Sequence, residues 1–267
     1  MTSIVDTHCH LDLSAFDEDR DAVIRNAIAV GVHSMVAIGF NPDRWHSTRR
    51  LCHAYPFMLR AVGVHPNDAG IWNDDVREAL ADECASGDPV AIGETGLDFF
   101  RDRADHEAQT LAFERQIELS RELSLPIIIH QRNAEAEVLE ALAPYAPIRG
   151  VMHCFTGSAS FASACMRLGL MLGIGGVATF PRSEELRSTI ARLPLRSIIV
   201  ETDAPYLAPQ SQRGKRNSPA LVTEVVEVIA SSRRVLVESI ADETTDNAIR
   251  LFGPRMSQAL EQGHQAA

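Results

Sequence analysis

Short apolar, β-branched runs alternate with amphipathic stretches along the whole chain of 267 residues. The runs are almost continuously apolar, as in parallel strands that are buried on both faces. Strands are predicted at eight places, which are residues 3–10, 32–39, 58–65, 89–96, 125–130, 149–155, 170–176 and 196–203. Eight strand–helix units in about 250 residues predict a (β/α)8 TIM barrel, an α/β fold forming a single domain over residues 1–267.

The stretches between these strands carry helical signals. In residues 105–124 the apolar side chains recur at a broadly helical spacing. Ser218 followed by Pro219 predicts an N-cap and a first turn for a helix that runs to about Ala230. A doubly wound open sheet is the alternative architecture. The first βα turn lacks a glycine-rich nucleotide loop, which disfavours the Rossmann version of that sheet.

Ionisable side chains gather where the predicted strands end. Asp6, His8 and His10 stand two apart in the first strand and therefore share one face. Further ionisable residues close later strands, namely His65, Glu94, His130, His153, Glu201 and Asp203. In a TIM barrel the active site lies at the carboxyl ends of the strands. So many polar groups in a partly dry mouth need partners, and bound metal ions would provide them.

The strand order divides these ligands between two ions. Strands 1 and 8 become neighbours when a barrel closes, and they supply one set, namely His8, His10 and Asp203. Strands 5 and 6 are adjacent and supply a second set, namely His130 and His153. Glu94 on strand 4 offers two oxygens and can bridge, which predicts a dinuclear site. Asp6 is expected beside the strand-1 histidines as a supporting residue.

The sole lysine of the chain, Lys215, bears on the identity of the bridge. Many dinuclear barrel hydrolases bridge their metals with a carboxylated lysine at the end of strand 4, where this chain has Glu94. Lys215 lies beyond strand 8 and cannot take that place, so the bridge falls to Glu94. Four histidines favour Zn²⁺ or Mn²⁺ over Mg²⁺, which prefers oxygen ligands, although availability can override affinity.

Composition narrows the classes of partner. The formal net charge of −11 argues against broad non-specific binding to nucleic acid, but it does not exclude a polyanion at one local site where bound metals supply positive charge. The five cysteines form no CxxC pair, which predicts reduced thiols in a cytoplasmic protein. No signal peptide or membrane-spanning stretch is evident, and neither is an obligatory protein partner.

Several segments together resemble the TatD family of metal-dependent deoxyribonucleases, among the amidohydrolase-like barrels. They are "VDTHCHLD" (5–12), "VGVHP" (62–66), "IGETGLDF" (92–99), "LPIIIHQRNA" (125–134), "MHCFTGS" (152–158), "ETDAPYLAP" (201–209) and "GKRNSP" (214–219). The resemblance implies a TIM barrel, two divalent metals and hydrolysis of phosphodiester bonds in DNA, typically from the 3′ end. The metal positions that it implies are His8, His10, Glu94, His130, His153 and Asp203. One departure is Asn133, which follows Arg132 where the family usually has an acidic residue.

Roles follow for individual residues as hypotheses. Asp203 orients or deprotonates a metal-activated water, Glu94 bridges the ions, and His65 contacts a phosphate or protonates the leaving oxygen. Phosphate contacts are expected from Arg132, Lys215 and Arg216. Bases could stack on the aromatic residues that follow strand ends, namely Phe99, Phe100, Phe155 and Tyr206.

Three functions compete on this evidence. The first is a 3′–5′ exodeoxyribonuclease that acts on single-stranded or frayed 3′ ends of DNA. The second is a D-aminoacyl-tRNA deacylase, an activity also attributed to relatives of the family, or another ester hydrolase on the same two metals. The third is an idle barrel that serves as a binding module. Every ligand position is filled, which disfavours the idle barrel. The sequence does not separate the other two functions, because the same ions can activate water toward both phosphorus and carbonyl centres.

Overall fold

The computed structural model describes residues 3–101 and 103–267, and eight strands in them form one sheet in the order β1 to β8. Each strand runs parallel to the next along the chain. The strands are β1 (Ile4–Cys9), β2 (Val32–Gly39), β3 (Met58–Val62), β4 (Pro89–Asp98), β5 (Ile127–Arg132), β6 (Gly150–Met152), β7 (Leu170–Ile174) and β8 (Ile198–Val200).

The sheet closes on itself where β1 meets the segment that follows β8. Cys9 pairs with Ala204 in a parallel bridge, and the His10 N–H donates to the Ala204 carbonyl at 2.7 Å. The Asp203 N–H donates to the His8 carbonyl at 2.9 Å. The TIM barrel that the sequence predicts is confirmed, and the doubly wound open sheet is excluded.

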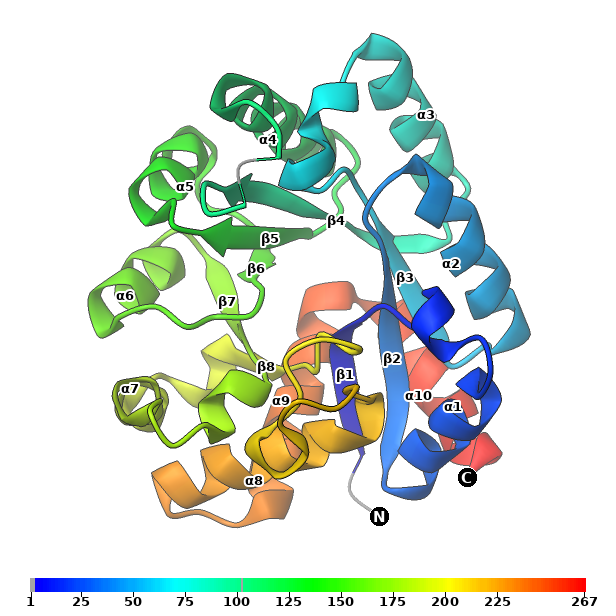
Figure 1. Ribbon diagram of the computed structural model, residues 1–267, viewed down its shortest axis with the longest axis vertical. Coiled ribbons are helices and arrows are strands. Elements are labelled where there is room, and N and C mark those ends of the chain that lie inside the picture. The colour runs from blue at the N-terminus through cyan, green and yellow to red at the C-terminus, as the bar shows by residue number, and fades with distance from the viewer. Residues whose placement is uncertain (1–2, 102) are drawn as a thin grey trace.

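Helices surround the strands, as Figure 1 shows. They are α1 (Arg20–Ala29), α2 (Pro42–Ala54), α3 (Asp74–Ala85), α4 (His106–Glu122), α5 (Glu135–Leu142), α6 (Ala159–Arg167), α7 (Glu184–Arg192), α8 (Val222–Arg233), α9 (Val237–Phe252) and α10 (Pro254–Ala266). The helix predicted at 105–124 is confirmed as α4. It begins after Asp105, whose side chain accepts from the backbone N–H groups of Glu107 and Ala108.

The entry into α8 differs from the prediction. Pro219–Leu221 form a 3-10 turn, α8 follows it, and the helix runs to Arg233 instead of Ala230. The Ser218 side chain makes no capping hydrogen bond. The neighbouring Asn217, which is fully buried, accepts from the Ser218 N–H and anchors the loop before the helix. Buried Asn217 therefore holds the start of this segment in place of the side-chain cap that was predicted for Ser218.

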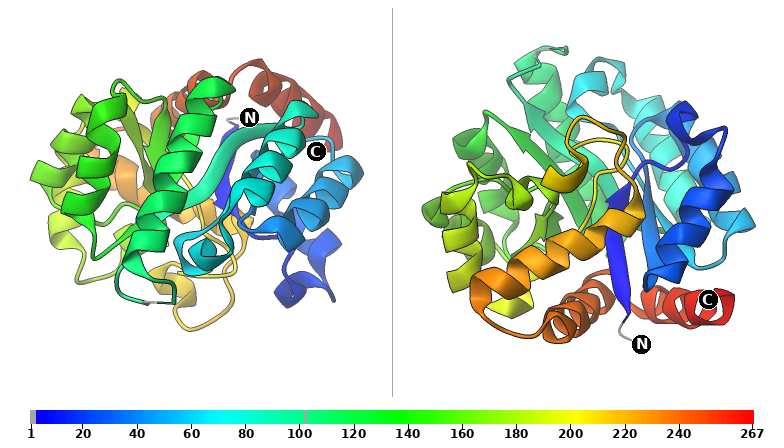
Figure 2. Two further views of the ribbon diagram at one scale, coloured as in Figure 1. Left: turned by 90° about the horizontal axis from the view of Figure 1, so that it is seen from above. Right: turned by 60° about the horizontal axis from the view of Figure 1, so that its bottom comes forward.

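The barrel interior is filled at the end where the strands begin. Apolar side chains from the strands, among them Val36, Leu59 and Ile128, belong to one cluster with Leu251 of α9 and Met256 of α10. Figure 2 shows these last helices at the end of the molecule where the N-terminus lies. Packing at that end leaves the opposite end, where the strands finish, for polar side chains.

No helix in the described ranges 3–101 and 103–267 is long and apolar enough to cross a membrane. The five cysteines, which are Cys9, Cys52, Cys84, Cys154 and Cys165, carry free thiols.

Candidate metal centre

Glu94 lies at the centre of the histidine cluster at the carboxyl ends of the strands. Its Oε2 is 3.4 Å from His8 Nε2. Its Oε1 is 2.7 Å from His130 Nδ1 and 3.3 Å from His153 Nε2. The two oxygens of one buried carboxylate thus face different imidazoles, which is the arrangement that a bridging ligand needs.

Asp203 faces the strand-1 histidines across the closure of the barrel. Its Oδ1 is 3.2 Å from His10 Nε2 and 3.8 Å from His8 Nε2. Its backbone has a φ of 58°, in the left-handed region that Asp tolerates better than most residues. The turn ends the extended run of β8 and aims the carboxylate at β1, so the predicted strand over 196–203 stops at Val200.

Two buried carboxylates lie behind the other two histidines. Glu201 Oε1 is 2.9 Å from His153 Nδ1, and it also accepts from the Cys154 backbone N–H. Asp98 Oδ2 is 3.3 Å from His130 Nε2. Each imidazole therefore has one ring nitrogen toward a supporting carboxylate and the other toward Glu94. The hydrogen bond between His153 and Glu201 is backing of the kind that fixes the tautomer and raises the basicity of a ligating histidine, whereas His130 Nε2 and Asp98 Oδ2 approach each other without a hydrogen bond.

Two glycines make the close approaches in this region possible. Gly96 has a φ of 139°, and a Cβ there would lie 2.0 Å from the His130 carbonyl oxygen. A Cβ on Gly173 would lie 2.3 Å from Glu201 Oε2. Larger residues would push β5 away from β4 and displace the carboxylate behind His153.

Burial and neighbouring charges set the protonation of the bridging carboxylate. Burial opposes the ionisation of Glu94, but the charge of His153 and hydrogen bonds from His130 and His153 hold its pKa well below the usual value. Glu94 is therefore a carboxylate at neutral pH, as a metal ligand must be.

Burial and neighbouring charges also set the pKa values of His8, His10 and Asp203. Burial lowers the pKa of His8, which keeps its ring neutral and its lone pair free. Burial opposes the ionisation of Asp203, but the hydrogen bond from His10 and the charge of His153 lower its pKa. Burial also opposes protonation of His10, yet its contact with Asp203 raises its pKa.

A comparison with known proteins accounts for this constellation. The family model described as "TatD related DNase" matches residues 5–253. The chain belongs to the TatD family. It is similar to the uncharacterized metal-dependent hydrolase YabD of Bacillus subtilis (strain 168), with 38% identity over 251 residues, or 93% of this chain and 98% of that protein.

Two further relatives of the TatD family are informative. The 3′-5′ ssDNA/RNA exonuclease TatD of Pectobacterium parmentieri is 36% identical over 255 residues, which are 92% of this chain and 98% of that protein. The crystal structure of YJJV, a TatD homologue from Escherichia coli K12, has a TM-score of 0.88 at 31% identity and covers 93% of this chain and 97% of that one. The chain is thus a metal-dependent hydrolase of the TatD family.

The side chains present fit the metals that the TatD family implies. Both ring nitrogens of His8 and Nδ1 of His10 are buried without a hydrogen-bond partner in the part of the chain that the structure describes. Buried polar atoms are nearly always paired, and one of these orphaned nitrogens, His8 Nε2, lies 3.4 Å from Glu94 Oε2, so His8 is placed as a ligand would be. Imidazole and carboxylate together suit Zn²⁺, Mn²⁺ and similar ions.

His65 also lies at the carboxyl ends of the strands, but it offers an N–H donor to the cluster and not a lone pair. β3 ends at Val62 and not at residue 65, and His65 precedes a 3-10 turn over Pro66–Ile71. Its Nδ1 accepts from the Asn67 backbone N–H at 3.0 Å, which puts the proton of the neutral ring on Nε2. Nε2 is 3.5 Å from Glu94 Oε1. Burial lowers the pKa of His65, so the ring is neutral and Nε2–H is a donor.

Asp6 supports the backbone between β1 and the end of β8. Its Oδ1 accepts from the backbone N–H groups of His8 and Thr202, and its Oδ2 accepts from the Thr202 hydroxyl. Burial raises its pKa to about 7. The supporting position expected from the sequence agrees with these contacts.

The three basic residues expected at the phosphates have different surroundings. The Arg132 guanidinium lies 3.9 Å above the centre of the Phe100 ring, at the end of β5. Lys215 Nζ is exposed and 3.0 Å from Gln212 Oε1. Arg216 makes two contacts with the Asp19 carboxylate, at 2.9 and 2.6 Å.

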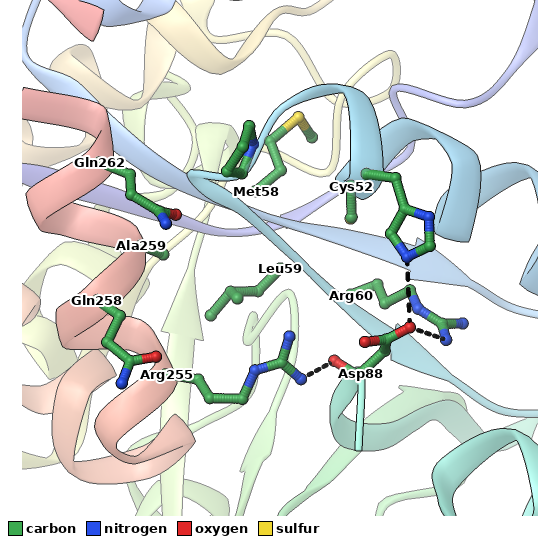
Figure 3. A pocket seen from close by; sticks show the side chains of 11 residues that line it. Cys52, Met58, Leu59, Arg60, Asp88, Arg255, Gln258, Ala259 and Gln262 are labelled. Atoms are coloured by element: carbon green, nitrogen blue, oxygen red, sulfur yellow. Dashed lines mark hydrogen bonds and ion pairs between the residues drawn. The ribbon is translucent and has the colours of Figure 1, made fainter. Parts of the chain in front are cut away.

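A cavity of about 330 Å³ lies elsewhere, beside the start of β3 and α10 (Figure 3). Its two arginines have protein partners. Arg60 contacts Glu83 and lies 3.5 Å from Asp88, and Arg255 donates to the carbonyls of Gly87 and Asp88. This cavity lies at the end of the barrel where the strands begin, and none of the candidate metal ligands lines it.

Sequence reasoning did not single out Asp98 and gave Glu201 no role. A signal for both was present. Residues 94, 96 and 98 alternate onto one face of β4, and 201 and 203 stand in the same relation after β8. A carboxylate two or four residues from a ligand on one face is placed to support the cluster.

Proposed function

We propose that the chain is a 3′–5′ exodeoxyribonuclease that cleaves phosphodiester bonds at a dinuclear site. The single observation that carries the proposal is the divergence of the two Glu94 oxygens toward His8 and toward His130 with His153. The exonuclease named among the relatives supports the choice of substrate class.

The residues divide into two sets around Glu94. One ion would be held by the side chains from β1 and after β8, namely His8, His10 and Asp203. The other would be held by the side chains from β5 and after β6, namely His130 and His153. When bound, two divalent cations lower the pKa of a water and stabilise charge on the attacking and leaving oxygens of the phosphate. Glu94 would fix the spacing between them.

Asp203 is the base in this proposal. Its carboxylate is ionised, lies beside His10, and has a second oxygen that can accept a proton from the attacking water. The left-handed turn and the hydrogen bond from its N–H to the His8 carbonyl hold it in place.

In this proposal His65 is a donor, whereas Asp203 accepts a proton. Its neutral Nε2–H faces the cluster, because the Asn67 N–H occupies Nδ1. It can donate to a phosphate oxygen or pass its proton to the leaving oxygen. The same tautomer makes Nε2 unsuitable as a metal ligand, so His65 is a donor in this account.

Phosphates beyond the cleaved bond would meet basic side chains. Arg132 keeps N–H edges available while its face rests on Phe100. Lys215 and Arg216 follow β8, and Arg216 would have to loosen its pairing with Asp19 to contact a phosphate.

The test is cleavage of end-labelled substrates of several kinds by the metal-loaded protein. We expect a 5′-labelled single strand of DNA to shorten stepwise from its 3′ end, and a blunt duplex to be cleaved more slowly. RNA and D-aminoacyl-tRNA are tested beside it. Release of the amino acid without any shortening of DNA would replace the nuclease with the deacylase.

A further inference from the structure

Two exposed aromatic rings stand out on the surface. Phe100 is 59% exposed and Tyr206 is 53% exposed, and no other Phe, Tyr or Trp in residues 3–101 and 103–267 is classed as exposed. Phe100 follows the end of β4, and Tyr206 follows β8, so both lie at the end of the barrel that holds the histidines.

Phe100 is held by a residue of the candidate metal centre. Asp98 Oδ1 accepts from the backbone N–H groups of Phe100 and Arg101, at 3.1 and 2.9 Å. The other oxygen of Asp98 faces His130. The backbone that carries the ring is thus hydrogen-bonded to a carboxylate that also faces the histidine cluster, and the ring itself is exposed.

Tyr206 is likewise fixed beside a candidate ligand. Its ring centroid is 5.9 Å from that of His10. Its backbone N–H donates to the Asp203 carbonyl at 2.8 Å, and its carbonyl accepts from the buried Asn217 side chain at 2.7 Å. The ring therefore borders the cluster, and its main chain is held on both sides.

The other aromatic residues that follow strand ends are not available in this way. Phe155 is buried and stacks on Phe161. Phe99 is half-buried and stacks on His106 at 3.7 Å. Of the four rings considered from the sequence, only Phe100 and Tyr206 present a wide face to solvent.

Positive charge lies beside Phe100 in a chain of net charge −11. Arg132 lies over Phe100, and Arg101 is half exposed beside it. Rings that alternate with arginines are typical of surfaces that bind single-stranded nucleic acid.

We propose that Phe100 and Tyr206 form a stacking platform for the bases of an unpaired strand, while Arg101 and Arg132 contact its phosphates. The inference rests on the proposed nuclease function and adds how that site would select its substrate. Bases in a duplex hide their faces against one another, so the platform favours single strands and frayed ends.

The test measures binding separately from cleavage. A fluorescent phosphorothioate oligodeoxythymidylate, which resists hydrolysis, is titrated with metal-loaded protein, beside a strand of equal length whose 3′-terminal positions are abasic. We expect Phe100→Ala and Tyr206→Ala each to weaken binding of the thymidylate about five- to hundredfold. The abasic strand should bind the wild type and both variants equally weakly.

Two further variants separate stacking from other effects. Tyr206→Phe keeps the ring and should keep the affinity. Leu236→Ala removes a side chain that is 71% exposed just before α9, and it should bind as the wild type does. The platform is overturned if both alanine variants bind the thymidylate normally, or if they lose the same factor on the abasic strand.

Cleavage of an ordinary single strand is scored in parallel. Ring-dependent binding without any cleavage would refute the nuclease and leave the platform standing. Cleavage with ring-independent binding would refute the platform and leave the nuclease standing.

Discussion

Glu201 Oε1 lies 2.9 Å from His153 Nδ1, and this contact turns the other ring nitrogen of His153 toward Glu94. Asp98 lies behind His130 with the ring reversed, Nε2 at the carboxylate and Nδ1 at Glu94, but at 3.3 Å this approach is an ion pair without a hydrogen bond. The candidate ligands on β5 and after β6 are thus held by buried carboxylates that contact no ion themselves in this account. Within residues 3–101 and 103–267, His8 and Nδ1 of His10 have no such backing, and the nearby Asp6 holds main-chain groups instead.

Glu201→Gln is predicted to weaken metal binding about ten- to hundredfold, because the amide cannot increase the basicity of His153 as a carboxylate does. Calorimetric titration of metal-stripped protein with Zn²⁺ or Mn²⁺ measures the affinity. Glu238→Gln, on the exposed first turn of α9, is the matched control. Unchanged metal affinity in Glu201→Gln would show that the contact between Glu201 and His153 does not strengthen metal binding.

His65→Gln is predicted to lower kcat about a hundredfold while the metal affinity stays the same. The reason is that its Nε2–H is a donor fixed by the Asn67 N–H, and not a ligand lone pair. Turnover and metal stoichiometry are measured on the same preparation. A loss of one bound ion would assign His65 to the ligands and refute the donor role.

Gly96→Ala is predicted to destabilise the protein by about 1–3 kcal/mol, because its Cβ would meet the His130 carbonyl and its φ of 139° suits only glycine. Thermal unfolding of the metal-free protein measures the change. Gly70→Ala is the control, since a Cβ at that exposed position meets nothing within 4 Å. Equal melting temperatures for both variants would show that β4 and β5 can separate at no cost.

Metal binding is predicted to raise the melting temperature of the stripped protein. A ligand at about a hundred times its Kd stabilises the folded state by about 2.7 kcal/mol, and each kcal/mol shifts Tm by roughly 2–4 °C in a domain of this size. Glu94→Gln should show a smaller rise, because one shared ligand is weakened for both ions. A rise of the same size in the variant would exclude Glu94 as a shared ligand.

The barrel could be predicted because its signal is repeated. Eight apolar runs at similar spacing each report a buried parallel strand, and an error at the end of one run does not alter the count. The ends themselves were less predictable. β3 stops at Val62, although extended backbone continues to His65, whose N–H donates to the Phe40 carbonyl. β8 stops at Val200, before the left-handed backbone of Asp203, whose N–H donates to the His8 carbonyl. Both ends depend on backbone partners distant in sequence.

The gathering of histidines and acids at one end could also be predicted, since strand ends in a barrel share an edge. What could not be read was which polar residues support others. Asp98 looks like a turn residue in the sequence, yet it caps the turn of Phe100 and faces His130. Arg216 looks like a free phosphate ligand, yet it pairs with Asp19 across the fold. Such pairings arise only from tertiary structure.

The central claim is that Glu94 joins two ions into one nuclease site, and one assay tests it most directly. Metal-stripped protein and Glu94→Gln are incubated with a 5′-labelled single strand of DNA while Mg²⁺, Mn²⁺ or Zn²⁺ is added back. The account predicts a ladder that shortens from the 3′ end, requires metal, and disappears in Glu94→Gln although the variant remains folded. A metal-dependent ladder of equal rate in the variant, or no ladder from wild-type protein shown to hold two ions, would contradict it.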